Sequence, residues 1–132
     1  MPTVLVASDA PWVCDLLKSS LVGPGFKVEA VTRGQEVRAA VFDLEPDLVV
    51  LDMQIANMGG FAVCIDLHLE ESADRLQHVP VLLLLDREAD RFLAHRADAE
   101  AMLVKPIDPG TLRRTVKRLL AGVESEDRRR PA

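Results

Sequence analysis

Aromatic residues and cysteines are scarce in this 132-residue sequence. It has no tyrosine, and Trp12 is its single tryptophan. Its two cysteines, Cys14 and Cys64, lack the spacing typical of a metal site. Both fall within apolar helical patterns, which favours buried free thiols in a reducing compartment over a disulfide.

Long hydrophobic runs and an excess of positive charge are also absent. No apolar run approaches the roughly 20 residues that cross a bilayer, and the first residues lack the charged segment and apolar core of a signal peptide. We therefore expect no membrane association and a cytoplasmic location. The chain has 21 acidic and 16 basic residues, a net charge of -5. Because an anionic surface repels phosphates, we expect no direct binding to nucleic acid.

What the sequence does contain is a fivefold alternation of short apolar runs with amphipathic stretches. Strands are predicted over residues 3–7, 26–31, 47–52, 79–85 and 101–104, and helices over 11–21, 35–44, the segment after Gly60, 87–97 and 109–120. This alternation predicts one α/β domain with a parallel sheet covered by helices on both faces. The fourth run is too apolar for a surface strand, so we place it at the centre of the sheet.

The domain is predicted to span residues 1–121. Residues 122–132 are charged and carry too little apolar surface to offset the entropy of ordering, so we expect a disordered tail there.

Polar residues follow four of the predicted strands. Ser8-Asp9 follows the first strand, Asp52 ends the third, Asp86 follows the fourth and Lys105 follows the fifth. Taken singly, each could be a helix or turn cap. Parallel sheets bind ligands beyond the carboxyl ends of their strands, however, so carboxylates and an ammonium are expected to meet at one edge.

These stretches resemble the CheY-like receiver domains of bacterial two-component signalling. The resemblance covers about residues 3–121 and rests on VLVASDAP at 4–11, DLVVLD at 47–52, MGG at 58–60, VPV at 79–81 and LVKP at 103–106. It implies a flavodoxin-like (βα)5 three-layer sandwich with strand order 2-1-3-4-5.

The resemblance also assigns roles to residues. Asp52 would accept a phosphoryl group from the phosphohistidine of a sensor histidine kinase or phosphotransfer protein, and Lys105 would pair with a phosphoryl oxygen. Asp9, Asp52 and the backbone carbonyl of Gln54 would bind Mg²⁺. The Lys105-Pro106 bond is cis in many relatives.

Of the positions that depart from the family pattern, three concern metal binding and switching. Ser8 replaces the first of two adjacent acids and could hold only a metal-bound water, so we predict weak Mg²⁺ binding. Leu85 replaces the Ser or Thr whose hydroxyl bonds the phosphoryl group. Met102 replaces the aromatic side chain that moves inward with it, so both switch positions are substituted.

Two readings of function remain open at this point. In the first, Asp52 is phosphorylated in a phosphorelay and the response reaches a downstream protein or a homodimer. In the second, the chain is a pseudo-receiver, a protein-interaction module that works without phosphorylation. The domain is not an enzyme in either reading, beyond self-phosphorylation and self-dephosphorylation. Trp12 either covers the acceptor or docks a partner, or simply packs on a neighbouring loop.

Two enzyme-like rivals fit the sequence less well. A flavodoxin would need a phosphate-binding loop after the first strand and aromatic residues for the flavin ring, and neither is present. An aspartate-nucleophile phosphatase would need a second acid two residues after Asp52, where Gln54 stands.

Overall fold

Five parallel strands form the centre of the molecule in the computed structural model, which describes residues 1–21, 25–55 and 58–129. They are β1 (Thr3–Ala7), β2 (Lys27–Val31), β3 (Leu48–Asp52), β4 (Val81–Leu85) and β5 (Ala101–Val104). Their order in the sheet is β2-β1-β3-β4-β5. The fold class and strand order expected from the sequence are thereby confirmed.

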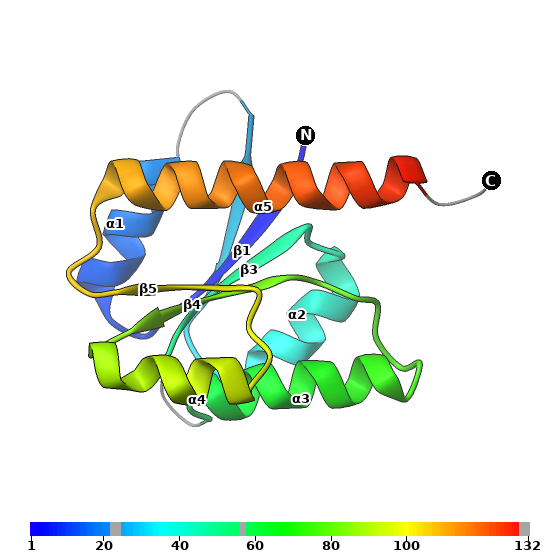
Figure 1. Ribbon diagram of the computed structural model, residues 1–132, viewed down its shortest axis with the longest axis horizontal. Helices are drawn as coiled ribbons and strands as arrows, with labels where there is room; N and C mark the ends of the chain where they lie inside the picture. Colours follow the sequence, from blue (N-terminus) through cyan, green and yellow to red (C-terminus); the bar gives the residue numbers. More distant parts are fainter. Residues whose placement is uncertain (22–24, 56–57, 130–132) are drawn as a thin grey trace.

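Helices cover both faces of this sheet (Figure 1). One face carries α1 (Pro11–Leu21) and α5 (Pro109–Arg129), and the other carries α2 (Val37–Leu44), α3 (Gly60–Ser72) and α4 (Arg91–Arg96). Two 3-10 turns, η1 (Gly34–Glu36) and η2 (Glu88–Asp90), precede α2 and α4. The result is the three-layer arrangement that right-handed β-α-β crossovers produce.

The core divides into two clusters because successive side chains of a strand point to opposite faces. Val4 and Val6 of β1 pack on the side of α1 and α5, whereas Leu5 packs on the side of α2, α3 and α4. All five residues of β3 and all five of β4 are buried. The central strand is β3, so the placement of the fourth strand at the centre was wrong. β4 lies between β3 and β5 with both faces covered, and this explains its unbroken apolar run.

Several element boundaries differ from those predicted. β4 begins at Val81 rather than Val79 because Pro80 has no N–H for the ladder. β3 begins at Leu48 rather than Asp47. The Asp47 N–H still donates to the Thr3 carbonyl at 2.8 Å, but the Thr3 N–H is bound by the Asp47 carboxylate, also at 2.8 Å.

The last helix, α5, continues to Arg129 instead of ending near Leu120. Residues 121–129 include Ala121, two Glu and two Arg, which are good helix formers, and this allows the helix to extend beyond the apolar positions that pack on the sheet. The predicted domain boundary at residue 121 stays a prediction, and residues 130–132 lie outside the described residues.

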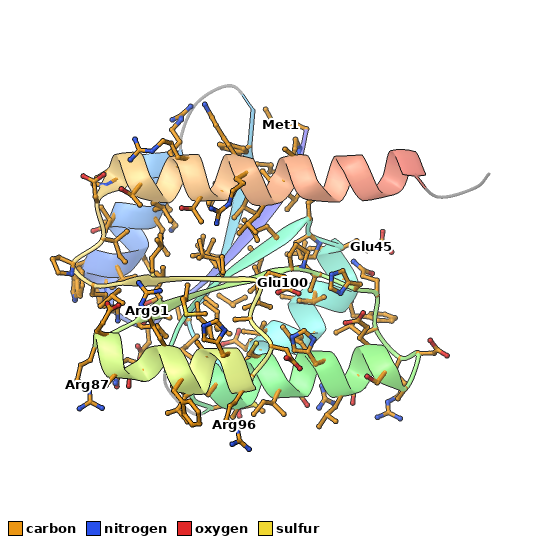
Figure 2. All side chains as sticks on the ribbon, viewed as in Figure 1. Met1, Glu45, Arg87, Arg91, Arg96 and Glu100 are labelled. Carbon is orange, nitrogen blue, oxygen red and sulfur yellow. The ribbon has the colours of Figure 1, made fainter. Side chains whose placement is uncertain are left out.

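Charged side chains project from the surface of the molecule. Figure 2 shows Arg87 and Arg96 pointing away from the sheet on the side of α4. Within the described ranges, none of the helices is both long enough and apolar enough to cross a bilayer.

Candidate functional site

The register of the sheet brings the candidate residues together at one edge. Ala7 is paired with Leu51, so the next residues, Ser8 and Asp52, lie side by side where β1 and β3 end. In the same way Leu85 of β4 is paired with Val104 of β5. The residues that follow this pair, Asp86 and Lys105, are therefore neighbours as well.

Asp52 is the buried centre of this edge, with 1% of its surface exposed. One carboxylate oxygen, Oδ1, accepts hydrogen bonds from Lys105 Nζ at 2.6 Å and from the Gln54 backbone N–H at 3.1 Å. The other oxygen, Oδ2, accepts one from Ser8 Oγ at 2.8 Å. A carboxylate oxygen can accept two hydrogen bonds. Because Oδ2 accepts one hydrogen bond from the described residues, it retains capacity to react or to bind a cation.

Lys105 is shared between two carboxylates. Its Nζ donates to Asp52 Oδ1 and, at 2.8 Å, to Asp86 Oδ1. Partial burial lowers the pKa of Lys105, but the hydrogen bonds that its ammonium donates to Asp52 and Asp86 outweigh the burial, so the net pKa is raised. The ammonium is therefore charged at neutral pH and fixed against the carboxylate of Asp52.

Asp86 is a site residue to which the sequence reasoning assigned no role. Besides its contact with Lys105, its Oδ2 accepts a hydrogen bond from Gln54 Nε2 at 2.5 Å. Burial raises the pKa of Asp86, while the bonds from Lys105 and Gln54 lower it by more, so the carboxyl is ionised. Its place after a buried strand was visible in the sequence, but its partners depend on the register between β4 and β5.

Ser8 has a direct contact that the sequence did not predict. It is fully buried, and its hydroxyl donates to Asp52 while accepting a hydrogen bond from the Ala10 N–H at 3.2 Å. The hydroxyl thus supports the Asp52 carboxylate without adding a negative charge. Its predicted role in holding a metal-bound water stays a prediction.

The residues expected to bind Mg²⁺ offer the oxygen ligands that this ion prefers, but the structure brings them together only in part. Asp52 and Gln54 are in contact, whereas Asp9 is exposed on the loop after β1 and its carboxylate makes no hydrogen bond or ion pair with the described residues. No cluster of three or more His, Cys, Asp or Glu side chains suited to a metal occurs in the described part of the chain. One or two carboxylates completed by waters are enough for Mg²⁺ in other sites, whereas a tighter site needs more anionic ligands.

The two substituted switch positions belong to the apolar core. Leu85 is fully buried in the cluster between the sheet and α2, α3 and α4. Met102 is half-buried and packs against the same cluster. Neither side chain offers a hydroxyl to the site, so any response of this edge must use another group.

Trp12 lies beside the site and is 59% exposed. Lys105 Nζ stands 6.0 Å from the centre of its ring, at the outer limit of a cation–π contact. Because of this contact, Trp12 is placed to report changes at Lys105.

The peptide bond between Lys105 and Pro106 is cis, as the resemblance implied.

Comparisons with known proteins identify the family of this chain. The family model of the response regulator receiver domain matches residues 4–117. The chain is 32% identical over 122 residues to the DNA-binding dual master transcriptional regulator RpaA of Synechocystis. The matched region covers 91% of this chain and 49% of that protein. It is also 32% identical over 120 residues to the transcriptional regulatory protein GltR of Pseudomonas aeruginosa, over 89% of this chain and 48% of that protein. The chain thus spans about half the length of these relatives.

Solved structures give the same result. The receiver domain of a signal transduction histidine kinase from Syntrophus aciditrophicus superposes with a TM-score of 0.83 at 28% identity, covering 100% of this chain and 96% of that one. The receiver domain of the sensor histidine kinase PA1611 from Pseudomonas aeruginosa, solved with a magnesium ion in its active-site cleft, has a TM-score of 0.78 at 20% identity and covers 91% of this chain and 98% of that one. Family match, relatives and fold together show that this chain belongs to the response regulator receiver domains of two-component signal transduction.

Proposed function

We propose that Asp52 is the phosphoacceptor of this receiver domain and takes its phosphoryl group from a phosphohistidine of a sensor histidine kinase or phosphotransfer protein. The observation that carries the proposal is the contact of 2.6 Å between the buried Asp52 carboxylate and the Lys105 ammonium. This pair combines a nucleophile with the cation that phosphoryl transfer needs.

In the reaction, a carboxylate oxygen of Asp52 attacks the phosphorus atom and forms a P–O bond. The P–N bond to the histidine breaks, and the imidazole nitrogen leaves with the electron pair. Asp52 becomes an acyl phosphate, which water later hydrolyses to restore the carboxylate and release inorganic phosphate. Lys105 pairs with the transferred group, and Ser8 and the Gln54 N–H hold the carboxylate in orientation.

Asp9, Asp52 and the Gln54 carbonyl are the residues that would hold Mg²⁺. When bound, the ion supplies positive charge that offsets the anionic phosphoryl oxygens. Because Ser8 carries no charge, the affinity of this site for Mg²⁺ is expected to fall below that of a site with two adjacent acids.

The same contacts favour a phosphoacceptor over an interaction module that works without phosphorylation. A module of the second kind has no use for a buried carboxylate, and a buried charge destabilises a fold unless it is paired. We take the output to run through a downstream protein or a homodimer. Phe92 and Leu93 of α4 are 66% and 49% exposed and are available for such a contact.

The test is phosphorylation by a small acyl phosphate donor in the presence of Mg²⁺, followed by intact-protein mass spectrometry. Wild type should gain the mass of one phosphoryl group, and this gain should survive acid and be lost in base. Asp52→Asn should gain nothing, whereas the matched control Asp43→Asn, on the exposed face of α2, should behave as wild type. A wild-type protein that gains no mass under these conditions would overturn the proposal.

A further inference from the structure

The site contains one more anionic group than phosphoryl transfer to Asp52 requires. Asp52 and Asp86 share the single ammonium of Lys105, at 2.6 and 2.8 Å. Arg87 directly follows Asp86, but its guanidinium donates a hydrogen bond of 3.4 Å to Asp90. The unphosphorylated site therefore holds two carboxylates against one bound cation.

Asp86 also connects three loops that surround the acceptor. It follows β4, while its partner Lys105 follows β5 and its other partner, Gln54, follows β3. Its own backbone N–H lies 3.3 Å from Met53 Sδ. With 31% of its side chain exposed, against 14% for Lys105, Asp86 lies nearer the solvent than its partner and can move into water.

A phosphoryl group on Asp52 changes the balance of charge around Lys105. It brings up to two negative charges to the place where Lys105 now meets Asp52. A single ammonium that pairs with this group is held less strongly by Asp86, and the two anions repel each other. The carboxylate of Asp86 then keeps its hydrogen bond from Gln54, and its backbone N–H keeps the contact with Met53 Sδ.

We propose that Asp86 is a positioning residue that competes with the phosphoryl group for Lys105, and that phosphorylation of Asp52 releases the loop between β4 and η2. The proposal rests on Asp52 being the phosphoacceptor. Release of this loop is a response that the Leu85 side chain cannot give, since leucine has no hydroxyl to bind the phosphoryl group. The residue that is released, Asp86, directly follows Leu85. This response differs from that of a receiver with a Ser or Thr at this position. There phosphorylation forms a contact between the hydroxyl and the phosphoryl group, whereas here it breaks the contact between Asp86 and Lys105.

The released loop leads directly to α4. Arg87 and Asp90 cap η2, and α4 begins at the next residue, Arg91. The exposed side chains Phe92 and Leu93 follow in the first turn of α4. Loss of the Asp86 contact is therefore passed to the apolar surface of α4 through a connection of only four residues.

The test compares wild type with Asp86→Asn, which keeps the size of the side chain and removes its charge. Removing one charge at roughly 5 Å from the phosphoryl group, in a loop open to solvent, should raise the rate of acyl phosphate formation about five- to tenfold. The affinity for beryllofluoride, read from Trp12 fluorescence, should rise by a similar factor. Asp86→Glu should return both values toward wild type.

Two further measurements separate this role from a general effect. Glu88→Gln removes the same charge two residues further along, at the start of η2, but Glu88 contacts Arg91, so the rate of this variant should stay within twofold of wild type. Hydrogen exchange in residues 86–90 should rise when beryllofluoride binds to wild type, and should already be high in free Asp86→Asn.

The outcomes distinguish the two proposals. If wild type is phosphorylated but Asp86→Asn is no faster and its loop exchange is unchanged, the competition is refuted while Asp52 remains the acceptor. If neither protein is phosphorylated, the acceptor proposal fails and the competition falls with it.

Discussion

Replacing Lys105 by methionine tests the charge arrangement of the site through protein stability. Methionine keeps the apolar stem but removes the ammonium, which leaves the carboxylate of Asp52 buried without its cation. Breaking a buried ion pair by removing one partner costs about 3–5 kcal/mol. The pair is not fully buried, since the Lys105 side chain is 14% exposed and Asp86 can turn toward water. We therefore expect Lys105→Met to lower the free energy of unfolding by about 2–4 kcal/mol, somewhat less than the loss of a fully buried ion pair.

The same substitution should cost far less once Asp52 is neutral. In an Asp52→Asn background no buried charge is left behind, so we expect Lys105→Met to cost under about 1 kcal/mol. The coupling between the two substitutions should then be about 2 kcal/mol, a value typical of residues in direct contact. Urea unfolding at pH 7, followed by circular dichroism, measures all four proteins of this cycle.

Lys27→Met is the matched control. Lys27 pairs with Glu29 at 3.6 Å on the surface, with 63% and 39% of the two side chains exposed. Such a pair contributes under about 1 kcal/mol. An equal cost of Lys105→Met in both backgrounds, or a cost no larger than that of the control, would refute the reasoning.

Three further predictions concern other parts of the molecule. Ser8→Asp should tighten Mg²⁺ binding by about tenfold, measured by titration of tryptophan fluorescence, since it adds an anionic ligand; an unchanged affinity would place the metal elsewhere. Burial raises the pKa of Cys64 to about 12, so at pH 8 roughly one thiol in ten thousand is ionised. A disulfide reagent should therefore modify Cys64 only after urea unfolding, and rapid modification in the native state would contradict its burial. Gly34→Ala should lower the free energy of unfolding by about 2 kcal/mol, because its Cβ would lie 2.1 Å from the Met58 carbonyl oxygen. Gly122→Ala, where a Cβ meets nothing within 4 Å, should be neutral or stabilising in the same urea assay.

Much of the fold could be predicted from local pattern. The bounds of β1, β5 and α1 agree with those expected, since each apolar run is closed by polar residues, proline or glycine. The ends that differ depend on contacts outside the run. Pro80 is buried but cannot donate to the ladder, and Asp47 uses its carboxylate on the backbone of Thr3.

The sequence predicts which residues form the candidate site better than it predicts the hydrogen bonds between them. Asp52 and Lys105 follow from their places at strand ends, and the structure joins them directly. The Ser8 hydroxyl bond and the sharing of Lys105 with Asp86 depend on which residues of neighbouring strands are level, and a single sequence does not carry that register.

The measurement that tests the central claim most directly is chemical mapping of the phosphorylated residue. Borohydride reduces an acyl phosphate to an alcohol, so an aspartyl phosphate becomes homoserine at the position that carried the phosphoryl group. After treatment with a phosphodonor and Mg²⁺, peptide mass spectrometry should find homoserine at position 52 and at neither Asp9 nor Asp86. Homoserine at one of those two residues, with Asp52 intact, would contradict the account.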